Sequence, residues 1–243
     1  MTPLLEMRSV SKQFGGLSAV TDLDIHVDEG ECLGLIGPNG AGKTTAFSIL
    51  MGELEPSSGS VHFRGGDITG LPTHRRVQLG IARTYQIPRP FGDMSVLDNV
   101  RVGAMPDSVM RLLIPDRATE SEWNFLQTVG FTAREASMLP GQLSMGELRK
   151  LELARNLATG PRIMLLDEVF AGLTVAEIGQ LTELLLQRKR DGMTYMVVSH
   201  DLKSLRPLVD RVVAISFGSA IAQGSFDAVL ENPQVREAYL GQD

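Results

Sequence analysis

The feature that most constrains this chain is a glycine-rich loop that ends in a lysine and a hydroxyl residue. Residues 37–45 read GPNGAGKTT and match the pattern G-x-x-x-x-G-K-[ST]. Residues 31–36 before the loop predict a strand, and residues 43–51 have helical periodicity. In this context successive backbone N–H groups and the helix dipole converge on one anion. A glycine turn that merely precedes a helix is the alternative, and the complete motif argues strongly against it.

The loop predicts a nucleoside triphosphate site in which each residue type has a task. Lys43 would bring a mobile positive charge to the β- and γ-phosphates, and the Thr44 hydroxyl would coordinate Mg²⁺. We therefore expect a nucleoside triphosphate and Mg²⁺ to be bound here. The expected nucleotide-binding residues of the loop are Gly37, Pro38, Asn39, Gly40, Ala41, Gly42, Lys43, Thr44 and Thr45.

Two adjacent carboxylates follow a predicted strand at residues 162–166, in which residues 163–166 form a continuous apolar run. Such a run is typical of a parallel strand that is buried on both faces, and ligands bind beyond the carboxyl ends of such strands. Asp167 is therefore predicted to hold Mg²⁺, and Glu168 to polarise the attacking water. A solvated strand end is the alternative reading for these two residues taken alone.

The rest of the chain predicts an α/β domain with a helical insertion. Strands are expected at 4–10, 24–27, 31–36 and 60–63, then at 162–166, 194–199 and 211–216, with helices at 175–190 and 202–209. This alternation is the pattern of a mostly parallel sheet. Residues 88–160 follow a proline-rich entry and show helical periodicity near 95–102, 119–129 and 145–159. We expect one domain over 1–243: a core of 1–87 and 161–243, a helical subdomain of 88–160, and a helical tail of 226–243 that breaks at Pro233.

Composition narrows the class of protein further. The net charge of −6 argues against a general nucleic-acid binder, although a local basic patch could lie within an acidic total. The single cysteine, Cys32, cannot form an internal disulfide, which fits a reducing compartment. No apolar stretch approaches the ~20 residues of a membrane-spanning helix, and the N-terminus lacks a signal-peptide pattern. We therefore expect a cytoplasmic protein whose membrane contacts run through a partner.

A third motif, at residues 143–149, reads LSMGELR and precedes Asp167 by about 20 residues. Ser144 and Glu147 form a capping box, so a well-capped helix is the plain interpretation. Beside the other two motifs, the segment resembles the signature sequence of the ABC-type ATPases, Leu-Ser-Gly-Gly-Gln. The resemblance implies that Ser144 and Gly146 bind the γ-phosphate of an ATP held by a second subunit.

The resemblance extends over nearly the whole chain and assigns three further residues. Gln86, in RTYQ, stands where the family has the glutamine that senses Mg²⁺ and the γ-phosphate. His200, in VVSHD, stands at the switch histidine, and Phe14 stands where an aromatic ring stacks on adenine. The implied catalytic residues are Glu168, His200 and Gln86, and the implied metal-binding residues are Thr44, Gln86 and Asp167.

Several positions depart from the family pattern. Met145 and Glu147 replace glycine and glutamine in the signature, and Val169 stands where proline is common. Thr174 stands where the family often has aspartate or asparagine in the loop that faces the partner. The last departure puts in doubt how tightly this subunit couples to the partner's site.

The resemblance also implies an assembly. The segments FGGL (14–17), AGL (171–173) and the tail 232–241 look like the importers for branched-chain amino acids and related polar amides. We expect a second ATPase subunit, identical or not, two transmembrane permease subunits, an indirect periplasmic solute-binding protein, and no nucleic acid. The location would be the cytoplasmic face of the inner membrane. Lipopolysaccharide-export ATPases, non-transport ABC ATPases and a non-hydrolysing scaffold are the alternatives.

Overall fold

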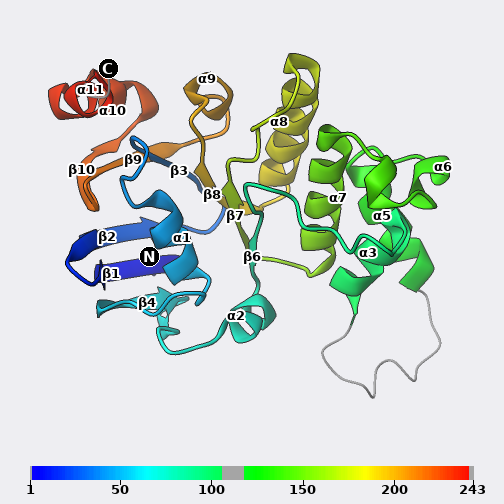
Figure 1. Cartoon of the computed structure of the whole chain (residues 1–243), viewed down its shortest axis with the longest axis horizontal. Helices are drawn as coiled ribbons and strands as arrows, with labels where there is room; N and C mark the ends of the chain where they lie inside the picture. The colour runs from blue at the N-terminus through cyan, green and yellow to red at the C-terminus, as the bar shows by residue number, and fades with distance from the viewer. Residues whose placement is uncertain (1, 106–117, 241–243) are drawn as a thin grey trace.

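The computed structural model describes residues 2–105 and 118–240 of the chain. Within them the strands form two sheets, one of six strands and one of four, and helices flank both (Figure 1). The described part of the chain contains no helix that is both long enough and apolar enough to cross a membrane.

The six-stranded sheet has the order β10-β9-β3-β8-β7-β6 and is parallel except at β10. Its strands are β3 (Cys32–Ile36), β6 (Ile81–Arg83), β7 (Ile163–Asp167), β8 (Thr194–Val198), β9 (Arg211–Ser216) and β10 (Ser219–Gly224). Every residue of β3, β7 and β8 is buried, which explains their continuous apolar sequences. The parallel strands bring the loops after β3, β7 and β8 to one edge of the sheet.

The four-stranded sheet has the order β2-β1-β4-β5 and is antiparallel. Its strands are β1 (Leu5–Phe14), β2 (Leu17–Val27), β4 (Ser58–Phe63) and β5 (Gly66–Asp67). Gly15 and Gly16 form the turn between β1 and β2, as the sequence predicts. The apolar face of this sheet packs on α1 (Lys43–Leu50) and on one face of the six-stranded sheet, forming one core.

A second core covers the opposite face of the six-stranded sheet. Alternate residues of each strand separate the two cores: Met164 and Leu166 of β7 lie in one, Ile163 and Leu165 in the other. The second core includes α8 (Val175–Arg190) and the helices α3 (Val96–Ala104), α5 (Ala118–Thr128), α6 (Ala133–Ala136) and α7 (Met145–Ala158), with the short 3₁₀ helix η1 (Pro140–Gln142) before α7. Figure 1 shows α3, α5, α6 and α7 gathered at one end of the molecule.

The expected architecture is confirmed: an α/β fold with an antiparallel N-terminal sheet, a mostly parallel sheet and a helical insertion. The tail forms α10 (Phe226–Glu231) and α11 (Pro233–Leu240), which meet at the expected proline. The helix expected at 202–209 is shorter, because α9 (Leu202–Leu205) stops before Pro207, which has no N–H to continue the ladder.

Six elements of the described chain were not expected individually from the sequence: β5, β6, β10, α2 (Thr73–Leu79), α6 and η1. β5, β6, α6 and η1 have two to four residues, too few for periodicity to show. β10 is a half-buried edge strand, and α2 is a polar helix with one fully buried side chain, Arg76.

Candidate nucleotide site

The loop between β3 and α1 needs two glycines for its shape. Gly40 has φ +77° and Gly42 has φ +104°, conformations that side-chain-bearing residues rarely adopt. A Cβ at Gly42 would also lie 2.4 Å from the carbonyl oxygen of Ala19 on β2. Gly42 is the N-cap of α1, so the loop leads directly into the positive end of that helix.

Lys43 lies at the start of α1 and is held by the loop itself. Its Nζ donates to the carbonyl oxygens of Gly37 at 2.5 Å and Pro38 at 2.8 Å. Burial lowers the pKa of Lys43, and the carboxylates of Glu168 and Asp167 act in the opposite direction. The Lys43 ammonium therefore lies inside the loop, where two carbonyl oxygens accept its hydrogen bonds and the Glu168 and Asp167 carboxylates favour its charged form.

A cavity of about 430 Å³ lies in front of the loop. The expected site residues that line it come from five segments of the chain: Phe14, Asn39, Gly40, Ala41, Gly42, Lys43, Thr44, Thr45, Gln86, Asp167, Glu168 and His200. Gly37 and Pro38 are buried behind the loop, and Pro38 lines a neighbouring cavity instead. The fold thus brings all of the expected site residues to one cavity except Gly37, Pro38, Ser144 and Gly146.

Glu168 has an unusual backbone conformation for a residue with a side chain. It follows the last residue of β7 with φ +49°, in the sparsely populated left-handed region that often marks functional positions. Its N–H donates to the carbonyl oxygen of Val198 at 3.0 Å, which fixes it against β8. The left-handed turn directs the carboxylate into the cavity, where it lines the wall.

The Glu168 carboxylate meets His200, which follows β8. The His200 N–H donates to Oε2 at 3.2 Å, and His200 Nε2 lies 3.3 Å from Oε1. Within the described residues, Oε1 is buried and has no hydrogen-bond partner. Burial raises the pKa of Glu168, and His200 and Lys43 oppose that shift. The site therefore contains a buried carboxylate with a raised pKa, whose Oε1 lies beside the His200 imidazole without forming a hydrogen bond to it.

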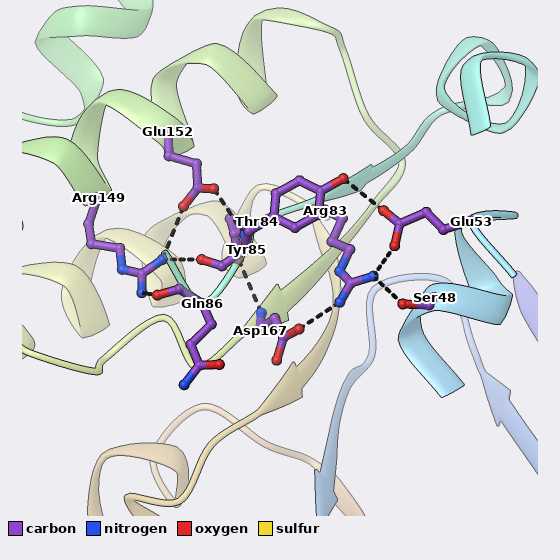
Figure 2. Close-up of polar contacts among 9 residues, drawn as sticks. All are labelled: Ser48, Glu53, Arg83, Thr84, Tyr85, Gln86, Arg149, Glu152 and Asp167. Carbon is purple, nitrogen blue, oxygen red and sulfur yellow. Dashed lines mark hydrogen bonds and ion pairs between the residues drawn. The ribbon is translucent and has the colours of Figure 1, made fainter. Parts of the chain in front are cut away.

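Asp167 is held by a buried arginine that was not expected from the sequence. Arg83 Nη2 lies 2.7 Å from Asp167 Oδ2, and Arg83 Nη1 contacts Glu53 at 2.8 Å and Ser48 Oγ at 3.1 Å (Figure 2). The Asp167 N–H also donates to Thr84 Oγ1 at 3.1 Å. The sequence offered one indication of this role: Arg83 is a charged residue that directly follows the apolar residues Ile81 and Ala82.

Three oxygen-bearing side chains lie where the expected Mg²⁺ would be needed. Thr44, Gln86 and Asp167 line both the main cavity and a second one of about 380 Å³ beside it. Hydroxyl, amide and carboxylate oxygens are the donors that Mg²⁺ takes, and the phosphates would supply others. The residues present therefore fit a magnesium ion bound together with a nucleotide.

Ser144 and Gly146 lie outside this cavity, at the start of α7. Ser144 is the N-cap of α7, and its capping box with Glu147 is complete. The Glu177 carboxylate of α8 lies against Gly146, since a Cβ there would be 2.0 Å from Glu177 Oε1. Glu177 in turn forms the capping box of α8 with Thr174. Ser144 is thus exposed at the helix start whereas Gly146 is buried, and neither residue lines the cavity of the chain's own phosphate loop.

Comparison with known proteins gives a consistent family. Residues 20–171 match the model of the ABC transporter family, and residues 221–243 match that of the branched-chain amino acid ATP-binding cassette transporter. The chain is 34% identical over 252 residues to the high-affinity branched-chain amino acid transport ATP-binding protein BraF of Pseudomonas aeruginosa, covering 99% of this chain and 98% of BraF.

Two further similarities were found. The lipopolysaccharide export system ATP-binding protein LptB of Acidithiobacillus ferridurans is 33% identical over 241 residues, with 99% of this chain and 98% of LptB covered. The solved structure of a nucleotide-free ATP-binding cassette from an ABC transporter superposes with a TM-score of 0.88 at 28% identity, covering 99% and 100% of the two chains. The chain therefore belongs to the ABC transporter family and is an ATP-binding subunit of that family.

Proposed function

We propose that this chain hydrolyses Mg·ATP and works as one half of a pair of ATPase subunits. The observation that carries the proposal is Glu168, a buried carboxylate beside His200 in the wall of the phosphate-loop cavity, where burial raises its pKa. A scaffold that only binds nucleotide would have no use for such a base.

Each residue of the cavity has a role in this proposal. Lys43 and the loop N–H groups bind the phosphates, and Phe14 stacks on the adenine. Thr44, Asp167 and Gln86 hold Mg²⁺, which supplies positive charge to the phosphates when it is bound. Because its pKa is raised, Glu168 accepts the proton of the attacking water more readily. His200, which contacts the carboxylate, orients Glu168.

The second half of the proposal follows from the position of α7. Ser144 and Gly146 do not line the cavity that the phosphate loop forms, so we assign them to an ATP held by a second chain. Each chain then supplies the cradle for one ATP and the lid for the other. The N-terminal end of α7, the positive end of the helix dipole, is suited to that role.

Replacing Glu168 by glutamine tests the hydrolytic assignment. Glu168→Gln should retain ATP binding and slow hydrolysis by about 100-fold or more, because the general base is lost. Glu183→Gln, an exposed residue of α8, is the matched control and should hydrolyse at the wild-type rate. Wild-type hydrolysis in Glu168→Gln would refute the role of the base.

We further propose that residues 87–100, at the entry to the helical unit 88–160, carry the contact with the permease subunits. Three apolar side chains near its entry are exposed: Ile87 by 71%, Phe91 by 47% and Met94 by 41%. Charged replacements of Phe91 or Met94 should leave ATP hydrolysis intact and abolish transport. Transport that persisted unchanged would show that the contact lies elsewhere.

The cargo that we propose is a branched-chain amino acid or a related small polar solute, which the transporter imports across the inner membrane. This chain would lie at the cytoplasmic face of that membrane. The similarity to BraF and the match of residues 221–243 support it. Loss of labelled leucine uptake on deletion of the gene is the expected result. Lipopolysaccharide export is the second candidate, because LptB is almost equally similar, and a defect in the outer membrane with normal uptake would favour it.

A further inference from the structure

A buried ion pair connects the start of α7 to the hydrolytic residues of the same chain. Arg149 and Glu152 are one turn apart on α7, with side chains 1% and 2% exposed and 3.2 Å between Arg149 Nη1 and Glu152 Oε2. Arg149 lies five residues after Ser144, about 7.5 Å along the helix axis at 1.5 Å per residue.

The pair holds the backbone around Gln86 from both sides. Glu152 Oε1 accepts the N–H of Tyr85 at 2.9 Å, and the guanidinium of Arg149 donates to the carbonyl oxygens of Tyr85 and Gln86 (Figure 2). These residues are more than 60 positions away in sequence. The peptide that carries Gln86 is thus fixed to α7 by three hydrogen bonds.

Arg149 also reaches the other hydrolytic segment. Its Nη2 lies 3.3 Å from the carbonyl oxygen of Glu168, the residue with the left-handed backbone. One side chain of α7 therefore contacts the main chain of both Gln86 and Glu168. A displacement of α7 cannot leave these two residues in place unless the contacts break.

A purely structural role would not explain this choice of residues. Apolar residues of similar volume often stabilise a core as well as a buried ion pair does, and they avoid the cost of desolvation. Every backbone group that the pair contacts lies next to the phosphate-loop cavity. Such specific contacts determine geometry, and the geometry determined here is that of the hydrolytic site.

On the basis of the proposed function, we propose that Arg149 and Glu152 are positioning residues that couple the two ATP sites of the pair. The start of α7 binds ATP in the partner's cradle, and the pair transmits that position to Gln86 and Glu168 in the chain's own site. Because each chain supplies its α7 to the other chain's cradle, ATP in either site favours the hydrolytic arrangement in the other.

The test is the ATP dependence of hydrolysis by Arg149→Lys. A lysine keeps the charge but lacks the planar fork that contacts several carbonyl oxygens at once. The wild type should show a Hill coefficient above 1, and Arg149→Lys a coefficient near 1. Its kcat should fall by about 10-fold or more because Gln86 is displaced, whereas nucleotide affinity under non-hydrolysing conditions should change by less than about 2-fold.

Arg76→Lys is the matched control. The Arg76 guanidinium is fully buried and donates to four carbonyl oxygens, those of Ile49, Leu50, Thr69 and Leu71. It contacts neither Gln86 nor α7. This variant should lower the Tm while the Hill coefficient stays at the wild-type value, which separates loss of stability from loss of coupling.

Glu152→Gln provides a second, nearly isosteric variant if Arg149→Lys does not fold, and it should also reduce the Hill coefficient. A wild-type Hill coefficient and kcat in a folded variant would overturn the inference. Absence of ATP hydrolysis in the wild-type protein would instead refute the proposed function, so the two failures are distinguishable.

Discussion

Removing the Arg83 guanidinium should strongly destabilise the protein. Arg83 is 4% exposed at its side chain and neutralises Asp167, which is 5% exposed, and Glu53, which is 27% exposed. Arg83→Met would leave the Asp167 carboxylate buried without its cation. Breaking a buried pair in this way costs about 3–5 kcal/mol of unfolding free energy. In a chain of this size that corresponds to a Tm lower by roughly 6–20 °C.

Urea unfolding followed by circular dichroism measures this loss. Arg190→Met is the control, because its pair with Glu183 is 57% and 69% exposed and should contribute less than about 1 kcal/mol. Arg83→Met combined with Asp167→Asn should recover part of the loss, because the second change removes the unpaired charge. A loss in Arg83→Met no larger than that in Arg190→Met would refute the argument that Arg83 neutralises the buried Asp167 carboxylate.

Three further predictions concern individual residues of the site. Lys43→Ala should remain folded but bind ATP roughly 10- to 100-fold more weakly by calorimetry, since a charge-assisted hydrogen bond is lost; unchanged affinity would contradict the cradle. Gly146→Ala should push the Glu177 carboxylate away from Thr174 at the N-terminus of α8, at a cost of about 1 kcal/mol of unfolding free energy. Gly179→Ala should instead stabilise α8, because no atom lies within 4 Å of the added Cβ. Equal urea midpoints for the two variants would contradict this prediction. The folded state binds a proton at Glu168 more tightly than the unfolded state does, so the unfolding free energy falls as the pH rises above about 4.5. Glu168→Gln should therefore have a larger unfolding free energy than the wild type at about pH 8. The difference between the two proteins should close toward about pH 4. A constant difference across that range would contradict the assignment of the raised pKa to burial of the carboxylate.

The sequence predicts the architecture well where local patterns carry the information. The strands β3, β7 and β8 are continuous apolar runs, and α7 and α8 begin at complete capping boxes. The phosphate loop has a unique pattern of glycines with a lysine. These features depend on neighbouring residues only, so they can be identified without knowledge of the tertiary structure.

Long-range contacts are what the sequence does not reveal. Arg83 and Asp167 are 84 positions apart, and Arg149 and Tyr85 are 64 apart. No periodicity relates such residues, because their proximity depends on the strand order β7-β6 and on the packing of α7. The left-handed conformation of Glu168 is equally invisible, since the residue type disfavours it.

No local pattern divides the expected site residues into two groups; the family resemblance alone implies that Ser144 and Gly146 serve an ATP held by a second subunit. In the structure Phe14, Gln86 and His200 join the phosphate loop in one cavity, whereas Ser144 and Gly146 do not line it. This separation depends on the packing of α7, which no short stretch of sequence encodes. The departure at Thr174 has a local account, because its hydroxyl caps α8.

The central claim is that hydrolysis needs two chains for each ATP. The most direct test measures the hydrolysis rate per chain against protein concentration, with the molecular mass recorded in the same solution, for this chain alone and mixed with the second ATPase subunit. We predict that the rate per chain rises with concentration, and that Mg·ATP converts Glu168→Gln from one chain of 26.4 kDa to a pair. A full rate per chain at every concentration, with the mass of a single chain throughout, would contradict the account.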